Sequence, residues 1–377
     1  MQNNTLEALT KPKTEKSKLL ALDGGGIRGI IAIEVLAKIE KILQQKLNKD
    51  DFVLADYFDY IAGTSTGAII AACLSKGMRV DEIRPFYIDS GEKMFSRARL
   101  LEQGKYKYKD KELAEQLQSV FGDETLGSQE LKTLLMMVMR NATTDSPWPI
   151  SNNPHALYND RNLPDCNLKI PLWRLIRAST AAPTFFPPEE IKVSEDQQKP
   201  FVFVDGGVTS FNNPAFQLFS MATAEPYNLN WETGEDKMLL VSIGTGLTSG
   251  ANKDLEPGQM NLLYNAKSIP SALMYASQRQ QDFLCRFLGN CLAGDPIDGE
   301  IGDMIGKKGS GDTNLFTYLR YNADLSEAGL KDLSLDDIDP KDVQSMDCVE
   351  HLDKFQRVGE AIAEHKVDES HFAGFLD

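Results

Sequence analysis

One short segment holds a serine in a setting that suits nucleophilic catalysis. The segment GTSTG at 63–67 follows the apolar run at 60–62 and precedes the apolar stretch at 68–74. A sharp turn between a strand and a helix lifts a serine hydroxyl clear of the backbone, and flanking glycines permit the close approach of the chain. The pattern predicts Ser65 as a nucleophile on an elbow made with Gly63 and Gly67. The alternative is that Ser65 only caps the helix that follows.

A serine hydroxyl needs a base within hydrogen-bond reach. Histidine is the usual base, but none of the four histidines follows a strand-like run (His155, His351, His365 and His371). Two aspartates do: Asp23 follows the run 19–22, and Asp205 follows the run 201–204. An ordinary aspartate, with a pKa of about 3.9, is a weak base at neutral pH, so burial or a hydrogen-bond network must make such an arrangement effective. The alternative for either aspartate is a turn or helix-capping role.

A glycine-rich segment, DGGGIRG at 23–29, could supply backbone N–H groups at the start of a helix. Such groups, with the helix dipole, can bind a developing negative charge as an oxyanion hole. Gly24, Gly26 and Gly29 also satisfy the GxGxxG pattern of dinucleotide-binding proteins, which is an alternative interpretation. That fingerprint requires a second strand ending in an acidic residue about 20 positions later. The region at that distance is the charged stretch 48–51, with little strand before it, so the pattern favours acyl transfer.

These residues must be positioned by a sheet. Apolar runs at 19–22, 60–62, 201–204 and 238–243 each end at a glycine-rich turn, and apolar residues recur at helical spacing over 30–47. The alternation predicts an α/β fold whose strand carboxyl ends gather their loops at one edge, where open α/β sheets place their sites. The run 131–139 could be a buried strand or a helix, and its methionines are expected in the core. The acidic segment 324–347 is expected to be a solvated loop with helix caps.

The composition excludes several classes of protein. The 377 residues are 42% hydrophobic and 25% charged, which is typical of a globular chain with a sizeable core. A net charge of −15 repels nucleic acid, so no nucleic-acid polymer is expected as a partner. Five scattered cysteines without a CxxC pair indicate reduced thiols in a cytoplasmic setting, and no spacing suggests a metal or a cofactor. Residues 1–17 are expected to be a flexible tail without a signal peptide, and no apolar run is long enough to span a membrane.

Five blocks, in this order, resemble the patatin-like phospholipases, a family of serine acyl hydrolases that use a Ser-Asp dyad. The blocks are DGGGIRG at 23–29, GTSTG at 63–67, ASTAAPTFFPP at 178–188, DGG at 205–207 followed by NNP at 212–214, and SIGTG at 242–246. The resemblance implies an α/β fold of the three-layer α/β/α sandwich type with a mostly parallel central sheet. It implies a single hydrolase domain over 18–377, in which 250–377 is a C-terminal extension that the blocks do not cover.

The same resemblance implies the roles of individual residues. Ser65 is the nucleophile and Asp205 the base, while Asp23 is a structural turn residue. The oxyanion loop comprises Gly24, Gly25, Gly26 and Arg28. The implied activity is phospholipase A-type cleavage of fatty acyl esters of membrane phospholipids through an acyl-enzyme, with neither metal nor cofactor. Some bacterial members act in antiviral signalling, which gives an alternative: the same hydrolase as an effector activated by a small cyclic nucleotide.

One basic stretch could bring the chain to a phospholipid surface. Between 93 and 111, seven basic residues stand against two acidic ones, with aromatic and aliphatic residues interleaved. Each basic residue near an anionic surface can contribute about 1 kcal/mol to binding. We therefore expect a cytoplasmic protein that is peripheral at the membrane when it acts. The membrane-facing candidates are Lys93, Arg97, Arg99, Lys105 and Lys107, and the alternative is an ordinary solvated helix and loop. The oligomeric state is not indicated by any pattern.

Overall fold

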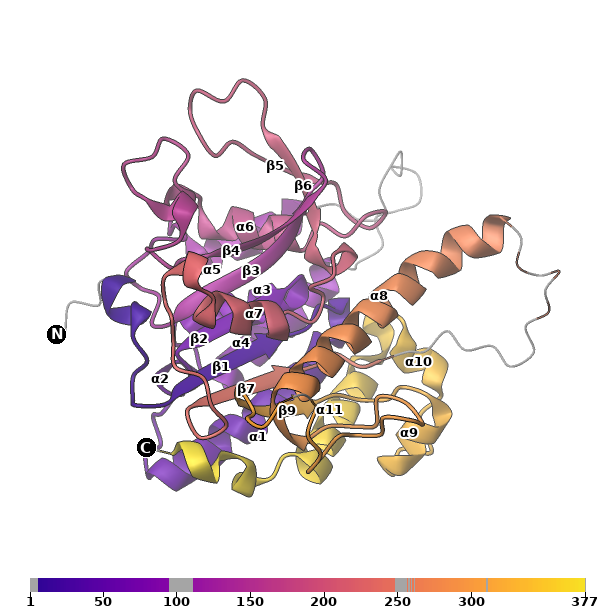
Figure 1. Ribbon diagram of the computed structural model, residues 1–377. Helices are drawn as coiled ribbons and strands as arrows, with labels where there is room; N and C mark the ends of the chain where they lie inside the picture. The colour runs from indigo at the N-terminus through magenta and orange to yellow at the C-terminus, as the bar shows by residue number, and fades with distance from the viewer. Residues whose placement is uncertain are drawn as a thin grey trace.

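The structure is a computed structural model that describes residues 6–94, 111–247, 256, 258, 260, 262–309 and 311–376 (Figure 1). Within these residues, nine strands form one sheet in the order β5-β6-β3-β2-β1-β7-β9-β8, and β4 pairs with β3. The strands are β1 (Ser17–Leu22), β2 (Tyr60–Thr64), β3 (Leu134–Asn141), β4 (Ser146–Ser151), β5 (Glu189–Ile191), β6 (Phe201–Asp205), β7 (Met238–Ile243), β8 (Asn290–Ala293) and β9 (Thr317–Tyr321).

The centre of the sheet is parallel, as expected. β1 pairs in parallel with β2 and β7, β2 with β3, and β9 with β7 and β8. Strands β1, β2, β7 and β9 are buried along their whole length, which is typical of parallel strands covered on both faces. Antiparallel pairing is confined to β3, β4, β5 and β6. The undecided run at 131–139 forms β3 from Leu134 onward, and its methionines are buried in the core as expected.

Helices cover both faces of the sheet, which confirms the three-layer α/β/α architecture (Figure 1). Alternate residues of each strand face different cores. Leu20 of β1 packs towards α1 (Gly29–Leu47) and α3 (Thr66–Ser75), whereas its neighbour Leu19 packs towards α7 (Ala215–Thr223). The helices are α1 (Gly29–Leu47), α2 (Leu54–Tyr57), α3 (Thr66–Ser75), α4 (Val80–Met94), α5 (Lys111–Phe121), α6 (Leu172–Ser179), α7 (Ala215–Thr223), α8 (Leu262–Leu288), α9 (Glu327–Asp332), α10 (Pro340–Gln344) and α11 (Leu352–Lys366).

The segment before β1 differs from the expected flexible tail over residues 6–17. A short 3-10 helix, η1 (Leu6–Thr10), lies against the body of the protein. Trp231 Nε1 donates a hydrogen bond to the Thr10 carbonyl at 2.8 Å, and the Lys13 backbone N–H donates to Asp59 Oδ1 at 2.8 Å. These partners are distant in the sequence, so the local composition of the segment gave no sign of them.

The described residues beyond 250 complete the same sheet and core. Strands β8 and β9 extend the sheet from β7, and α11 packs on α1. The acidic segment 324–347 contains the short helices α9 and α10, whose N-caps Ser326 and Asp339 accept hydrogen bonds from Gly329 N and Lys341 N. The helix caps agree with the expectation, but Leu330, Leu335 and Val343 of this segment are buried in the core, so it is not a wholly solvated loop. Among the described residues, no helix is both long enough and apolar enough to cross a bilayer.

Candidate active site

Ser65 occupies the sharp turn between β2 and α3. Its backbone angles, φ 54° and ψ −126°, are rare for any residue other than glycine and carry a conformational cost of about 1–3 kcal/mol. The side chain makes no capping hydrogen bond to α3, so the capping alternative is not supported. The strained turn instead directs the hydroxyl away from the helix that it begins.

The two glycines of the segment allow this turn by close packing. A Cβ atom on Gly63 would lie 2.1 Å from the Gly67 carbonyl oxygen, and a Cβ on Gly67 would lie 2.5 Å from the Leu22 carbonyl oxygen. Both distances are far inside van der Waals contact, and both involve backbone atoms that cannot move aside. The first turn of α3 can therefore rest against the end of β1 only where residues 63 and 67 lack side chains.

The hydroxyl of Ser65 and the carboxylate of Asp205 are in direct contact. Ser65 Oγ donates a hydrogen bond to Asp205 Oδ2 at 2.5 Å, and the Gly207 N–H donates to the other carboxylate oxygen at 2.6 Å. Both residues of the pair are buried, with 8% and 4% of their surface exposed. A nucleophile within reach of a base that is itself oriented by a third group is the arrangement that activates a serine.

The pairing pattern of β3 explains why these two residues meet. β2 runs parallel to β3 and its last residue, Thr64, pairs with Val138. β6 runs antiparallel to β3 and its last residue, Asp205, pairs with Met139, the next residue along. Since β4 occupies the other edge of β3 at both positions, β2 and β6 share one edge and meet end to end. Asp205 thus approaches Ser65 on a strand that runs antiparallel to β3. The sequence had predicted that both residues would follow the carboxyl ends of parallel strands at one edge of the sheet.

The segment 178–188 connects both members of the pair, a function that the sequence motif did not reveal. Ser179 Oγ accepts a hydrogen bond from the Ser65 N–H at 2.9 Å and donates one to the Val138 carbonyl at 2.5 Å. The Asp205 N–H donates to the Ala181 carbonyl at 3.0 Å. One short segment at the end of α6 therefore fixes the backbone at both positions.

Burial makes Asp205 a stronger base than an ordinary aspartate. Loss of contact with water raises the pKa of the Asp205 carboxyl to about 6, although hydrogen bonds from Ser65 and Gly207 and the charge of Arg177 oppose the rise. A base with a pKa near the working pH is the more effective proton acceptor. The surroundings of Asp205 therefore raise its basicity, as the sequence analysis required of a carboxylate base.

The histidines lie elsewhere, as their sequence context predicted. His155 contacts Glu7, His351 contacts Asp342, and His371 Nδ1 lies 2.8 Å from Tyr321 Oη. His365 is exposed on α11. The hydrogen-bond partner of Ser65 Oγ is a carboxylate and not an imidazole.

The glycine loop after β1 packs directly against Ser65. A Cβ on Gly24 would lie 3.1 Å from Ser65 Cβ. The Gly24 N–H donates to the Asn212 carbonyl at 3.1 Å and is therefore already used. Within the described residues, no acceptor is bound to the N–H groups of Gly25 and Gly26, which leaves these two amides available to an oxyanion. The sequence did not distinguish among the three glycines, because Asn212 is distant along the chain.

Two charged residues of this loop are buried and make contacts typical of structural residues. Arg28 is buried, which lowers the pKa of its guanidinium to about 10, and its Nη1 lies 3.4 Å from the Gln344 carbonyl. Asp23 is fully buried and receives two hydrogen bonds from Arg320 of β9, at 2.9 and 2.6 Å. Gln278 of α8 adds a third at 3.3 Å. Asp23 therefore anchors the loop to parts of the chain beyond 250, where no sequence motif pointed to a functional residue.

The start of α1 is unsuited to the dinucleotide alternative. The Ile27 N–H donates to the Met346 carbonyl at 2.9 Å, and Tyr87 Oη donates to the Gly26 carbonyl at 2.6 Å. A Cβ on Gly29 would lie 2.2 Å from Tyr87 Oη. The place where a pyrophosphate would meet the helix N-terminus is therefore filled by Met346 and Tyr87. In the described part of the chain, no group of three or more His, Cys, Asp or Glu side chains could hold a metal ion.

The membrane-facing candidates are not placed. Lys93 falls at the end of α4, where only the backbone is described. The other four lie outside the described residues (Arg97, Arg99, Lys105 and Lys107).

Comparison with known proteins decides the family. A model of the patatin-like phospholipase family matches residues 20–219, which include Ser65, Asp205 and the glycine loop. The chain belongs to the patatin-like phospholipases. The matched region ends before α8, β8 and β9, so the partners of Asp23 lie outside it.

Three curated relatives show how far the likeness extends. The chain is 34% identical to Patatin-17 of Solanum cardiophyllum over 63% of each chain, and 33% identical to Patatin-T5 of Solanum tuberosum over 63% of each chain. It is 32% identical to Patatin-like protein 1 of Arabidopsis thaliana over 72% of this chain and 70% of that protein. The chain thus spans about 63% of the length of the first two relatives. Among solved structures, VipD from Legionella pneumophila aligns over 94% of this chain and 68% of its own with 13% identity and a TM-score of 0.34, too distant for any argument.

Proposed function

We propose that the chain is a lipid acyl hydrolase of the phospholipase A type, in which Ser65 attacks the ester and Asp205 is the base. The main support is the 2.5 Å hydrogen bond from Ser65 Oγ to Asp205 Oδ2, at a strained turn in a member of the patatin-like phospholipase family. The expected substrate is a fatty acyl ester of a membrane phospholipid.

The acylation step begins with a proton transfer. Asp205 Oδ2 takes the proton of Ser65 Oγ as the oxygen attacks the ester carbonyl carbon. The carbonyl oxygen becomes an oxyanion, for which the N–H groups of Gly25 and Gly26 are the proposed donors. Collapse of this tetrahedral intermediate breaks the bond to the alcohol, which leaves with the proton from Asp205. The fatty acyl group remains bound to Ser65.

Deacylation repeats the sequence with water in place of the alcohol. Asp205 takes a proton from a water molecule, which attacks the acyl carbon of the ester on Ser65. The second tetrahedral intermediate collapses with release of the fatty acid, and the proton returns to Ser65 Oγ. The Gly207 N–H, bonded to the other oxygen of Asp205 at 2.6 Å, keeps the carboxylate oriented through both steps.

The test replaces each member of the pair. Ser65→Ala should abolish covalent labelling by a fluorophosphonate and lower the hydrolysis of phospholipid vesicles by more than about a thousandfold, because the nucleophile is lost. Asp205→Asn keeps an oxygen for the hydrogen bond but cannot take a proton, so its rate should fall by about 10² to 10⁴. Lipid mass spectrometry of the products identifies the ester bond that is cut.

Ser119→Ala is the matched control, because Ser119 is an exposed serine of α5 whose hydroxyl bonds to the nearby Gln116 carbonyl. Wild-type rates in Ser65→Ala would overturn the proposal. The nucleotide-activated alternative stays a prediction: activity that appears only when a cyclic dinucleotide is added would favour it.

A further inference from the structure

Helix α8 has two parts of different character. Its carboxyl-terminal half lies against the sheet, and Gln278, Asp282 and Arg286 are buried there. Nearer its start, Ile269 is 51% exposed and Leu273 is 65% exposed. Figure 1 shows this part of α8 projecting beyond the sheet. Large apolar side chains that stay in water on a projecting helix indicate a binding surface.

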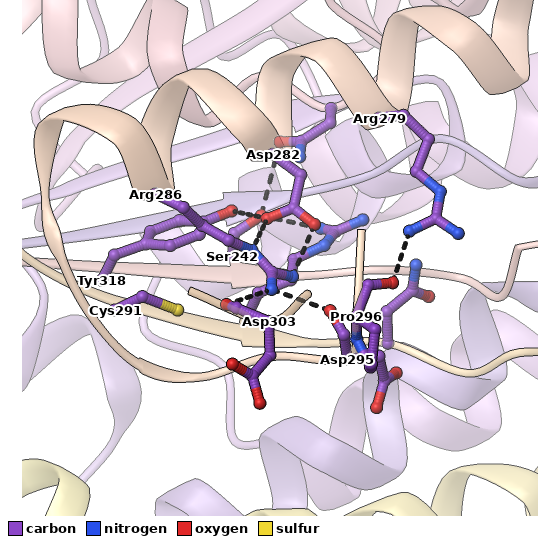
Figure 2. Close-up of polar contacts among 12 residues, drawn as sticks. Ser242, Arg279, Asp282, Arg286, Cys291, Asp295, Pro296, Asp303 and Tyr318 are labelled. Carbon is purple, nitrogen blue, oxygen red and sulfur yellow. Dashed lines mark hydrogen bonds and ion pairs between the residues drawn. The ribbon is translucent and has the colours of Figure 1, made fainter. Parts of the chain in front are cut away.

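Polar contacts fix the buried half of α8 (Figure 2). Arg286 forms an ion pair with Asp282, one turn earlier, at 2.7 Å. Its Nη1 also donates to the carbonyls of Asp295 and Asp303 at 2.7 and 2.8 Å. Tyr318 of β9 donates a hydrogen bond to Asp282 Oδ1 at 3.2 Å. A helix anchored in this way holds its exposed part in a fixed position relative to the sheet.

A groove of about 400 Å³ lies between this exposed part of α8 and the loop after β6. Ile269, Leu273 and Met274 line one side, and Val208, which is 43% exposed, lines the other. None of the residues that line it is charged. Of the eight large apolar side chains that are most exposed among the described residues, three belong to this one groove, so their exposure is concentrated rather than scattered.

The groove lies next to the Ser65–Asp205 pair, and Gly207 joins the two. Gly207 lines the groove, and its N–H is bonded to Asp205 Oδ1. A Cβ on Gly207 would lie 3.0 Å from Asp205 Oδ1 and 3.6 Å from Met274 Cε, so the carboxylate and the end of Met274 both border the space beside Gly207. On another side of Ser65, the backbone of Gly24 packs against its side chain.

We propose that this groove binds the fatty acyl chain of the ester that Ser65 attacks, an inference that rests on the proposed function. The carbonyl carbon must come within about 3.5 Å of the hydroxyl oxygen, so its alkyl chain must leave through space that adjoins the pair. The groove adjoins the pair and is apolar, which suits an alkyl chain. It offers no charged partner to a phosphate or ammonium headgroup.

The test is a chain-length series of soluble p-nitrophenyl esters from butyrate to decanoate. Each methylene that the groove buries should raise kcat/KM by up to about fourfold, so the wild type should prefer decanoate. In the double variant Ile269→Gln/Leu273→Gln, the ratio of kcat/KM for decanoate to that for butyrate should fall by at least about tenfold. Glutamine keeps the helix propensity and approximate size of these exposed side chains, so the fold should be retained.

Leu157→Gln is the matched control, because Leu157 is 73% exposed and lies outside the groove. If the decanoate-to-butyrate ratio is unchanged in the double variant and Ser65 is still needed to hydrolyse both esters, the groove is not the acyl-chain site, and the proposed function stays in place. An equal fall of the same ratio in Leu157→Gln would also overturn the assignment of the groove, because general surface hydrophobicity would then explain the preference for the longer ester. If the wild type shows no Ser65-dependent hydrolysis of any ester, the proposed function fails, and the groove assignment fails with it.

Discussion

At the scale of single residues, the surroundings of Asp205 decide what its carboxylate can do. A carboxylate in water releases its proton near pH 4 and holds it too weakly to be an effective base at neutral pH. Burial raises the pKa of Asp205 to about 6, while Ser65 and Gly207 donate hydrogen bonds that favour the ionised form. The group is therefore ionised at neutral pH and yet basic enough to accept a proton from the serine.

The raised pKa of Asp205 predicts the pH dependence of hydrolysis. Only the ionised carboxylate can accept the proton, so kcat/KM should be constant above about pH 7 and fall tenfold per pH unit below about pH 6. The measurement is a pH–rate profile with a soluble uncharged ester. The apparent pKa should change little with temperature, as for a carboxylic acid. An apparent pKa near 4 in this profile would contradict the assignment. So would an apparent pKa that shifts strongly with temperature, as that of an imidazole does.

Residue types in the chain were enough to identify Ser65 and Asp205 as candidates, because a GxSxG segment and a post-strand aspartate are local patterns. The sequence could not give the raised pKa, because burial depends on the whole fold. It also could not show that Ser179 holds the Ser65 backbone, or that Asn212 occupies the Gly24 N–H. Those contacts join segments that are far apart along the chain.

At the scale of elements, β3 organises the site by pairing with β2 and β6 along one edge. Periodicity predicted that 60–62 and 201–204 are strands, but it holds no information on the direction in which a strand runs. The antiparallel course of β6 follows from pairing, which is decided between segments. For the same reason, the contribution of β9 and α8 to the loop after β1 could not be predicted.

The buried pair of Asp23 and Arg320 predicts a large effect on stability. Arg320→Met would leave the Asp23 charge buried without its partner, which should lower the free energy of unfolding by about 3–5 kcal/mol. Asp23→Asn combined with Arg320→Met should recover much of that loss, because no buried charge remains. Urea denaturation measures both.

The control for this pair is Arg357→Met, which removes the exposed partner of Asp337 and should lower the free energy of unfolding far less than Arg320→Met does, because water screens an exposed ion pair. A similarly small cost for Arg320→Met, or a double variant no more stable than the single one, would show that the buried pair does not anchor the loop.

At the scale of the whole molecule, the alternation of strands and helices along the sequence predicted the class of fold correctly, but the composition of the first residues was misleading. Alternating apolar runs and glycine-rich turns are sufficient to predict an α/β fold, whereas the three-layer sandwich was implied by the resemblance to the patatin-like phospholipases. Lysines and polar residues before β1 suggested a tail, yet residues 6–17 lie against the body because Thr10 and Lys13 find partners in Trp231 and Asp59. A polar segment can be ordered by a few well-placed contacts, and composition does not report them.

The net charge of −15 makes any approach to an anionic bilayer depend on local basic residues. We propose that the basic stretch between 93 and 111 is the membrane-facing surface. Replacing four of its residues by glutamine should weaken co-sedimentation with anionic vesicles, since each contributes about 1 kcal/mol near such a surface (Arg97, Arg99, Lys105 and Lys107). The effect should decrease as salt is added.

A variant in which four exposed lysines elsewhere on the protein are replaced by glutamine has the same net charge and is the control (Lys41, Lys169, Lys331 and Lys341). Equal loss of vesicle binding in both variants would assign the effect to net charge alone. Unchanged binding in the first variant would remove the basic stretch as a membrane contact.

The end-to-end meeting of β2 and β6 on β3 has a consequence for how the protein acquires activity. If β6 slipped by one residue along β3, Asp205 would move by about 3.3 Å and its side chain would turn to the opposite face of the sheet. Ser65 would keep its strained turn but lose the carboxylate that we propose as its base. Hydrolytic competence should therefore appear late in refolding, after β6 has settled into its final alignment, and its recovery should trail the return of helical circular dichroism.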